Sequence, residues 1–260
     1  MISLKICKRP HHPILLPFLA GAFLAGACSQ QTGSLSSSDG WVSLFDGNSF
    51  NGWEMKSEIA ERIWSIKDGV IDCDPIQDGR DYKNLWSEDE FGDFELHVEW
   101  RIKDLKGISK TPTVLPDGGY LLDASGEKVT KPVPGADSGI YVRGSNKSQI
   151  NIWAWDIGSG EVYGYRNNQR DPEIRAGVTP KTKADKTIVE WNTFHITMKG
   201  EHLTVVLNGE TVLDEARLPG VPESGPIALQ HHGGYNETEG VWNGASSLVQ
   251  FRNIKIKKLQ

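Results

Sequence analysis

The sequence predicts an all-β protein of the sandwich class. Short segments with period-two alternation recur at regular spacing, and no segment combines helical periodicity with capping residues. The 260 residues also include 28 Gly and 9 Trp, a composition typical of a turn-rich β protein with aromatic binding surfaces. Many short strands at regular spacing indicate two packed sheets. The length suffices for one large β domain or two small ones.

The first 27 residues have the composition of an export signal. Lys5, Lys8 and Arg9 precede an apolar run over residues 14–27, and Cys28 follows directly. Such a segment is removed on export and takes no part in the fold. The small residues before Cys28 resemble a bacterial lipobox, which implies that Cys28 is lipidated. The leucine of that box stands one place further from the cysteine than usual, so an ordinary signal peptidase site stays open.

Lipidation of Cys28 predicts an exported lipoprotein, periplasmic or in the outer membrane of a bacterium. Ser29 follows Cys28, whereas an aspartate there retains lipoproteins at the inner membrane in enteric bacteria, so outer-membrane sorting is favoured. Cys7 lies in the removed segment. Cys73 then has no disulfide partner, and we interpret it as a packing residue.

Composition and charge exclude two classes of function. With a net charge of -6, the chain has no excess of positive charge that would attract nucleic acid. No segment after residue 27 is apolar enough to span a bilayer, so we expect membrane contact only through the lipid anchor. Residues 28–40 are rich in Ser and Gly and predict a flexible tether. Residues 41–260 are predicted to form the folded domain.

The strands of this domain can be placed in order. Two hairpins carry strong turn signals, Asp68-Gly69 and Asn208-Gly209. Two long connections are expected at 103–134 and 166–190; the first carries a weak hairpin pattern, and connections of that length are usually functional or mobile. We place it over the binding face. The predicted strands are 41–45, two within 64–71, 94–102, two within 137–166, 193–199, 203–207, 211–213, 227–232 and 249–256.

The stretch 137–166 carries the most informative polar pattern. Ile150 and Ile152 alternate with polar residues, as in strands with one buried face. The opposite face gathers a guanidinium, two amides and two aromatic rings: Tyr141, Arg143, Gln149, Asn151 and Trp153. Amides and arginine bind hydroxyl groups, and an aromatic ring covers the apolar face of a sugar. The pattern is consistent with a hydroxyl-rich ligand or with an ordinary solvated face.

Segment 94–102 shows the cleanest alternation in the chain, with Glu95, His97, Glu99 and Arg101 on one face. Glu99 and Arg101 either pair with each other or belong to a site. In a site, Glu99 would be a base or acceptor, and Arg101 or Arg143 would stabilise an anion.

His232 shares a strand face with Gln230 in the segment IALQHH. There an imidazole can be a base, an acid or a metal ligand, or it can be structural. Two adjacent histidines on a regular strand point to opposite faces, so we rank His232 above His231.

Metal-site signals are weak. Asp156 and Glu161 bracket Gly158-Ser159-Gly160, where carboxylates either bind a cation or cap the turn. If a divalent metal ion is the cofactor, Asp156, Glu161 and His232 are the candidate ligands, but the spacing alone predicts no metal. The P-loop, EF-hand, GxSxG and HExxH motifs are absent. Glu99 and Glu161 are conceivable glycosidase carboxylates, although no laminarinase-type strand accompanies them.

A set of motifs in fixed order resembles one family. The segments are LFDGNSFNGW, WSIKDGVI, FGDFELHVEWR, DSGIYVRG, GSGEVYGY, EWNTFHITMKG, LTVVLNGETV, GPIALQHHG and VQFRNIKIKKL. They resemble the 3-keto-disaccharide hydrolase family, formerly a domain of unknown function, over nearly all of Trp41 to Leu259. The resemblance implies a concanavalin-like jelly roll of two curved antiparallel sheets with the site on the concave face. It also implies cleavage of glycosides whose C3 hydroxyl has been oxidised to a ketone.

That chemistry needs one base, one enolate stabiliser and groups that hold the sugar. The C3 carbonyl acidifies the C2 proton, a base removes it, the C1 group leaves by elimination, and water then adds. The catalytic residues expected are His232, Glu99, Arg143 and Glu161. The substrate-binding residues expected are Arg101, His97, Tyr141, Gln149, Asn151, Trp153 and Gln230.

Two departures from the family pattern bear on these roles. Relatives often carry N-S-G where this chain has Asp137-Ser138-Gly139, and G-Y-E-x-Q where it has Ser148-Gln149-Ile150-Asn151. If that acidic position is catalytic in relatives, Gln149 cannot replace it as a base, and Glu161 or His232 would have to serve.

The alternative to an enzyme is a non-catalytic carbohydrate-binding lipoprotein, because a fold does not establish activity. In that case Tyr141, Trp153 and Trp155 would anchor the sugar.

Overall fold

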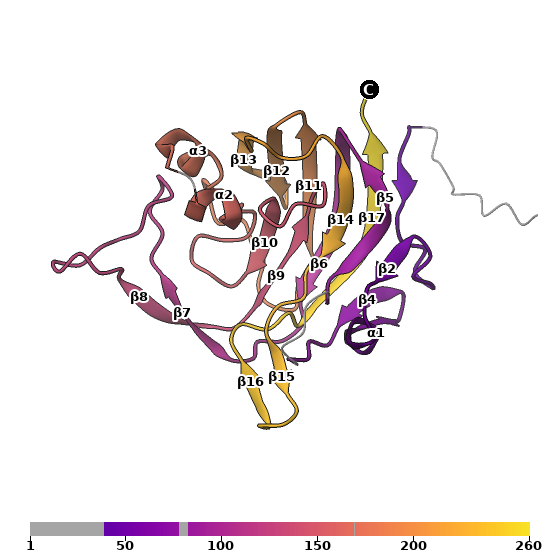
Figure 1. The fold of residues 1–260 in the computed structure, drawn as a ribbon, viewed down its shortest axis with the longest axis horizontal. Coiled ribbons are helices and arrows are strands. Elements are labelled where there is room, and N and C mark those ends of the chain that lie inside the picture. The colour runs from indigo at the N-terminus through magenta and orange to yellow at the C-terminus, as the bar shows by residue number, and fades with distance from the viewer. Residues whose placement is uncertain (1–38, 78–82, 169) are drawn as a thin grey trace, which may run out of the picture. The chain divides into compact units, whose positions relative to one another are not determined.

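The structure is a computed structural model that describes residues 39–77, 83–168 and 170–260. Two antiparallel sheets pack on each other, and two smaller hairpins and three short helices surround them (Figure 1). This arrangement confirms the predicted all-β sandwich. The export segment, Cys28 and most of the tether lie outside the described residues, all of which belong to the unit Ser34–Gln260.

The larger sheet has eight strands in the order β13-β12-β11-β6-β17-β4-β3, with β1 paired to β17. Its bounds are β1 (Val42–Ser43), β3 (Trp64–Lys67), β4 (Val70–Cys73), β6 (Phe94–Ile102), β11 (Asn192–Lys199), β12 (His202–Leu207), β13 (Glu210–Arg217) and β17 (Val249–Lys258). The two predicted hairpins are confirmed. Asp68 and Gly69 have φ of 52° and 77°, and Asn208 and Gly209 have 54° and 89°, the positive values that a two-residue type I′ turn requires.

The smaller sheet has five strands in the order β10-β9-β14-β5-β2. Its bounds are β2 (Trp53–Met55), β5 (Leu85–Phe91), β9 (Asp137–Tyr141), β10 (Gln149–Trp153) and β14 (Gly225–Leu229). β9 and β10 are the two strands predicted within 137–166. β14 ends at Leu229, so Gln230 and His232 stand just beyond the strand that was predicted to include them.

The remaining elements lie around the two sheets. β7 (Ile108–Pro112) pairs with β8 (Thr130–Pro134), and β15 (Gly234–Asn236) pairs with β16 (Val241–Asn243). The first hairpin occupies the connection predicted at 103–134. The helices α1 (Glu58–Ile63), α2 (Tyr163–Asn168) and α3 (Pro172–Gly177) have six residues each, too few to show helical periodicity in the sequence. Figure 1 shows α2 and α3 next to each other on the β10 side of the smaller sheet.

The core lies between the two sheets. The larger sheet contributes Leu96, Val98 and Trp100 of β6, and the smaller sheet contributes Ile150 and Ile152 of β10. Because successive side chains of a strand alternate between its two faces, the polar residues of β6 and of β10 point away from the core, on opposite outer faces of the sandwich. In the part of the chain that the structure describes, no helix is long and apolar enough to cross a membrane.

Candidate functional site

A cavity of about 320 Å³, lined by polar and aromatic side chains, opens on the outer face of the smaller sheet. We call it the amide cavity. β9, β10 and the residues directly after β14 form most of it, and its lining residues are Asp137, Gln149, Asn151, Trp153, Trp155, Tyr163, Gln230 and His232. The structure thus brings together six of the residues predicted to contact a sugar, namely Gln149, Asn151, Trp153, Trp155, Gln230 and His232. The cross-strand pairs Trp153–Asp137 and Gln149–Tyr141 place the polar side chains of β9 on the same face.

Two interlocked glutamines form the floor. Gln149 Nε2 donates to Gln230 Oε1 (2.6 Å), and Gln230 Nε2 donates back to Gln149 Oε1 (3.2 Å). The second N–H groups go to Ser138 O (3.3 Å) and Tyr141 Oη (3.2 Å). The amide nitrogens are therefore used, and the two Oε1 atoms keep a lone pair each for ligand hydroxyls. Tyr141, which stacks on Trp86 at 6.0 Å, thus supports the floor and does not line the cavity.

Gly139 explains why this floor is possible. A Cβ at position 139 would lie 2.6 Å from Gln149 Nε2 and 2.8 Å from Ile150 O. Any larger residue would displace the glutamine pair. The space above Gly139 is therefore closed to a ligand, because the Gln149 side chain fills it.

His232 and Asp137 are the titratable pair of the cavity. His232 Nδ1 lies 2.7 Å from Ala245 O and 3.8 Å from Asp137 Oδ2. A carbonyl oxygen only accepts, so Nδ1 carries the proton and Nε2 of the neutral ring keeps its lone pair. Ser247 Oγ accepts from His232 N and donates to Asp137 O, both at 2.6 Å, which fixes the two residues relative to each other.

Burial is the main influence on the pKa of Asp137. It raises the pKa of this carboxyl to about 6, against the opposing effect of His232. A carboxyl group with such a pKa exchanges its proton near neutral pH, which is the property of a general acid or base.

An aromatic wall closes one side of the cavity. The rings of Trp153 and Trp155 stack with centroids 4.0 Å apart and planes 4° apart, and Tyr163 meets Trp153 edge-on at 6.4 Å. Trp153 Nε1 donates to Gly158 O at 2.7 Å, so its orientation is fixed. Such a wall suits the apolar face of a sugar ring.

Glu161 lies behind the cavity wall. Its carboxylate is fully buried and forms an ion pair with the equally buried Arg166, and Asn151 Nδ2 lies 3.5 Å from Glu161 Oε2. The predicted catalytic residue Glu161 therefore does not line the cavity, and its nearest link to the cavity runs through Asn151.

Three predicted site residues lie on the other sheet. His97, Glu99 and Arg101 point outward from β6, on the face opposite to the amide cavity. Arg252 Nε donates to Glu99 Oε2 (2.6 Å), and Arg101 Nε donates to Gln250 Oε1 (2.7 Å). The prediction that they share a face with Gln149 and Gln230 was wrong, because β6 belongs to the larger sheet.

Arg143 was also predicted on the binding face, and this too was wrong. β9 ends at Tyr141, and Arg143 adopts a φ of 52°, which breaks the alternation of the strand. Its side chain is 2% exposed and donates to the carbonyl oxygens of Gly92, Gly200 and Pro222 and to the carboxylate of Asp93. These contacts make it a structural residue remote from the cavity.

The candidate metal ligands do not converge. Asp156 is exposed and pairs with Lys131, and Glu161 is buried against Arg166, while His232 faces the cavity. Among residues 39–77, 83–168 and 170–260, no group of three or more His, Cys, Asp or Glu is arranged to bind a metal ion. The arrangement does not fit a divalent ion held by these three residues.

Two lining residues were missed as functional candidates. Asp137 was noted only as a departure from the family pattern, although its spacing of four from Tyr141 places both on one strand face. Tyr163 gave no signal, because it comes from a six-residue helix that the sequence pattern does not reveal.

We expect the substitution Glu99→Gln to leave any catalytic activity of the amide cavity unchanged within about twofold, because Glu99 lies on the other sheet. Hydrogen bonds from Asn253 and Arg252 hold the pKa of this half-buried carboxylate below its usual value, although partial burial opposes them. The stability change should be about 0–1 kcal/mol, as for other partly exposed ion pairs. Steady-state kinetics and urea unfolding measure both, and a tenfold loss of kcat would show that Glu99 takes part in catalysis.

The chain is similar to one family and to one curated protein. Residues 40–257 match the family model described as a 3-keto-alpha-glucoside-1,2-lyase-like domain. A "3-keto-disaccharide hydrolase" of Bacteroides thetaiotaomicron is 26% identical over 183 residues, which cover 68% of this chain. The matched region spans 58% of the length of that relative.

Solved structures give the fold. Two candidate glycosyl hydrolases from Parabacteroides distasonis ATCC 8503 align with TM-scores of 0.53 and 0.50, at 22% and 21% identity. The first alignment covers 85% of this chain and 84% of that protein, and the second covers 84% and 99%. At such identity the likeness concerns the fold alone, and it agrees with the concanavalin-like jelly roll that the sequence motifs implied.

Proposed function

The chain belongs to the 3-keto-alpha-glucoside-1,2-lyase-like domain family, and on this premise we propose that it cleaves the glycosidic bond of 3-keto-glycosides in the amide cavity. The observation that carries the proposal is the His232–Asp137 pair at 3.8 Å, placed beside an amide floor and an aromatic wall. A carbohydrate-binding protein needs the floor and the wall. It does not need a buried carboxyl of raised pKa beside an oriented imidazole.

In the first half-reaction, elimination, His232 Nε2 takes the proton from C2, and the electron pair of the C2–H bond forms the enolate with C3. The enolate then collapses to the ketone while the bond between C1 and the leaving oxygen breaks. The Asp137 carboxyl gives its proton to that oxygen. The product in the cavity is a 1,2-unsaturated 3-ketone.

In the second half-reaction, water adds at C1 and gives a proton to the Asp137 carboxylate. His232 returns its proton to C2, which regenerates the 3-ketone and the starting state of both side chains. Acid and base thus exchange roles between the two halves, as general acid–base catalysis allows.

The remaining lining residues bind and orient the sugar. The free Oε1 lone pairs of Gln149 and Gln230 accept from ring hydroxyls, and Asn151 Nδ2 can donate to the enolate oxygen. Oriented donors of this kind stabilise charge that develops in the transition state. The stacked Trp153–Trp155 pair covers the apolar face of the ring.

The test is incubation of the purified protein with 3-keto-trehalose and with 4-nitrophenyl 3-keto-glucoside, with unoxidised trehalose as the matched control. Release from the keto substrates alone is expected, because only the ketone acidifies the C2 proton. In D₂O the product 3-keto-glucose should carry deuterium at C2, after correction for exchange without enzyme. Saturable binding without release would instead indicate a carbohydrate-binding protein.

Asp137→Asn separates the acid from the base. We expect the rate with 3-keto-trehalose to fall by about 10²-fold, the usual contribution of a general acid. The rate with the 4-nitrophenyl substrate should fall less, because nitrophenolate leaves without a proton. In the unsubstituted protein, activity should decline as the pH rises through about 6, where Asp137 loses its proton. Steady-state rates between pH 5 and pH 9 test this, and equal losses with both substrates would contradict the acid role.

The same substitution should stabilise the fold at alkaline pH. The native pKa of Asp137, about 6, lies above the value of an unfolded aspartate, so the native state binds the proton more tightly. This stabilisation is fully present below the unfolded pKa and is lost as the pH rises through 6, which leaves a buried carboxylate. Asparagine removes that charge, and we expect a gain of roughly 1–3 kcal/mol at pH 8, measured by urea unfolding.

We also propose that the protein is exported and carries lipid on Cys28. The basic and apolar residues before Cys28 support this. Metabolic labelling with an alkyne fatty acid should mark the wild-type chain, while the substitution Cys28→Ser should abolish the label and leave the protein in the soluble fraction. A labelled Cys28→Ser protein would contradict the proposal.

A further inference from the structure

A second cavity, of about 410 Å³, lies next to the end of β6 and the end of β10. We call it the tryptophan cavity. Its walls come from β6, β10, the end of β8 and the connection before β11; the lining residues are Trp100, Ile102, Leu105, Pro134, Trp153, Ala154, Lys183, Asp185, Lys186, Thr187, Ile188 and Asn192. Its volume lies within the usual range of small-molecule sites, roughly 300–1,000 Å³.

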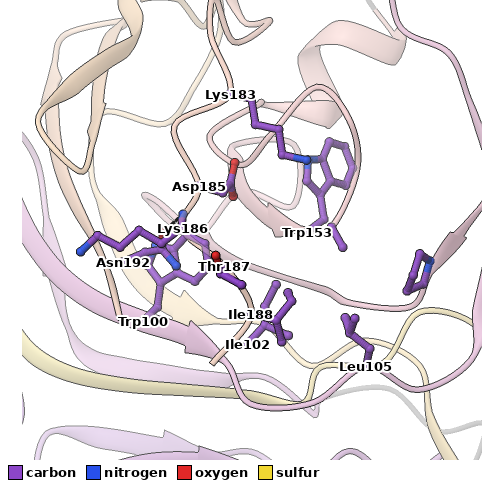
Figure 2. A pocket seen from close by; sticks show the side chains of 12 residues that line it. Trp100, Ile102, Leu105, Trp153, Lys183, Asp185, Lys186, Thr187, Ile188 and Asn192 are labelled. Atoms are coloured by element: carbon purple, nitrogen blue, oxygen red, sulfur yellow. Dashed lines mark hydrogen bonds between the residues drawn. The ribbon is translucent and has the colours of Figure 1, made fainter. Parts of the chain in front are cut away.

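Two indole rings flank this cavity. Figure 2 shows Trp100 and Trp153 on opposite sides of the space, with Ile102 and Ile188 along a third side. Trp153 Nε1 already donates to Gly158 O, so this residue offers its ring and no donor. Large apolar side chains on three sides favour a flat apolar ligand.

Five of the twelve lining residues are polar, and four of them come from the connection before β11. Figure 2 shows Asp185 between the two tryptophans and Lys183 next to Trp153. The Asp185 carboxylate accepts from Ser159 N (3.0 and 3.2 Å) and retains lone pairs, and Lys183 Nζ donates once, to Trp155 O (3.1 Å). Both can therefore still bind a hydroxyl group.

Trp100 adds an orphan donor in the wall. Its Nε1 is buried and has no hydrogen-bond partner among the described residues. A buried indole N–H usually finds an acceptor, and leaving a buried donor unpaired is unfavourable. The Nε1 atom is covered, so a ligand in the cavity would contact the Trp100 ring and not this donor.

We propose that the tryptophan cavity binds a planar aromatic group that carries an oxygen substituent, as in a phenol or an aryl ether. The ring lies between Trp100 and Trp153, and the oxygen faces the Asp185 carboxylate and the Lys183 ammonium group. This aromatic group has two possible sources, a free phenol or the aglycone of an aryl glycoside. Only the second source rests on the proposed function.

Trp153 connects the two cavities, because its ring lines both of them. An aromatic group that contacts Trp153 in the tryptophan cavity therefore lies next to the sugar site in the amide cavity. For an aryl glycoside, the sugar would occupy the amide cavity while the aglycone occupies the tryptophan cavity. A free phenol would bind beside the sugar without being joined to it.

The first experiment needs no catalytic activity. Calorimetric titration of the purified full chain with 4-nitrophenol should show saturable binding to one site. Ile188→Trp fills the cavity and should weaken this binding at least tenfold, and Ala154→Leu, a smaller filling substitution, should weaken it in the same direction. Val189→Trp is the matched control: Val189 lies on the same connection, is 57% exposed and does not line the cavity, so binding should stay unchanged.

The second experiment distinguishes the sources. If the cavity holds the aglycone, Ile188→Trp should raise KM at least tenfold for 4-nitrophenyl 3-keto-glucoside and leave KM for methyl 3-keto-glucoside unchanged. If it holds a free phenol, both KM values should stay unchanged while 4-nitrophenol binding is lost.

The proposal is overturned if 4-nitrophenol does not bind, or if Ile188→Trp and Ala154→Leu bind it as tightly as the unsubstituted chain. If the protein binds 4-nitrophenol but cleaves neither keto substrate, the proposed function is wrong, and so is the assignment of the aromatic group to an aglycone. The proposal of an aromatic site would still hold.

Discussion

His232→Gln is expected to reduce kcat for 3-keto-trehalose by about 10²–10⁴-fold, the range typical for removal of a general base. Glutamine keeps a polar side chain of similar reach but has no group that takes a proton near neutral pH. Because the change affects a proton transfer and leaves the amide floor in place, KM should change little. The C2 exchange step should fail together with cleavage, since both need the same base.

Solvent exchange gives the sharper measurement. Substrate incubated in D₂O with the His232→Gln variant should not acquire deuterium at C2. The Asp137→Asn variant should still exchange the C2 proton of a substrate whose poor leaving group it cannot expel, because His232 is intact in this variant. A His232→Gln variant that exchanges C2 at the wild-type rate would mean that another residue is the base.

The matched control is His195→Gln. His195 lies on β11 of the larger sheet and faces outward beside Glu95, at 3.8 Å from its carboxylate. The substitution makes the same chemical change at a half-exposed histidine remote from the amide cavity. We expect His195→Gln to have the kcat and KM of the wild type. A loss of kcat that occurs only in His232→Gln can then be assigned to the amide cavity.

The sequence predicted those parts of the fold that local patterns determine. β6 follows the predicted segment 94–102 residue for residue, and both hairpin turns form where Asp-Gly and Asn-Gly stand. Helices of six residues escaped prediction, because fewer than two turns give no periodicity. Their ends are defined instead by caps such as Ser57, whose hydroxyl accepts from Ala60 N at 3.3 Å.

The errors about the site have a common physical cause. Alternation tells which residues of one strand share a face, but it does not tell which sheet the strand joins. Glu99 and Gln149 both lie on polar strand faces, and those faces point to opposite sides because the core lies between the two sheets. Gln149, Asn151 and Trp153 share one face, as predicted, because they belong to one strand.

Asp137 could have been found by the same rule. It begins β9, and it shares a face with Gly139 and Tyr141 by simple alternation. What the sequence does not contain is its pKa, which depends on burial by residues far away in the chain. The tautomer of His232 is equally non-local, because the acceptor Ala245 O stands 13 residues further along.

The largest effect on stability is expected for Arg143→Ala. Its guanidinium is buried and bonded at Nε to Gly92 O (2.9 Å), at Nη1 to Gly200 O (2.7 Å) and Pro222 O (3.1 Å), and at Nη2 to Asp93 Oδ1 (2.7 Å). Truncation removes all of these partners at once. Breaking a buried charge pair typically destabilises a protein by about 3–5 kcal/mol, so the midpoint of urea unfolding should fall by a large fraction.

Arg143→Lys separates charge from geometry. Lysine keeps the positive charge but presents a point donor, which cannot reproduce a planar fork that serves carbonyl groups from three chain segments. We expect the free energy of unfolding of Arg143→Lys to lie between the values of the wild type and of Arg143→Ala. Both variants, measured well below their unfolding temperatures, should retain wild-type kcat per folded molecule, because no atom of Arg143 lines the amide cavity.

This pair of measurements decides between the two roles considered for Arg143. An enolate stabiliser would lose about 10²–10³-fold in kcat on truncation while the unfolding free energy changed little. A structural residue would show the reverse, with stability lost and kcat retained. The hydrogen bonds to Gly92, Gly200 and Pro222 support the second outcome, because a guanidinium whose donors are held by carbonyl oxygens has no free edge to offer an enolate.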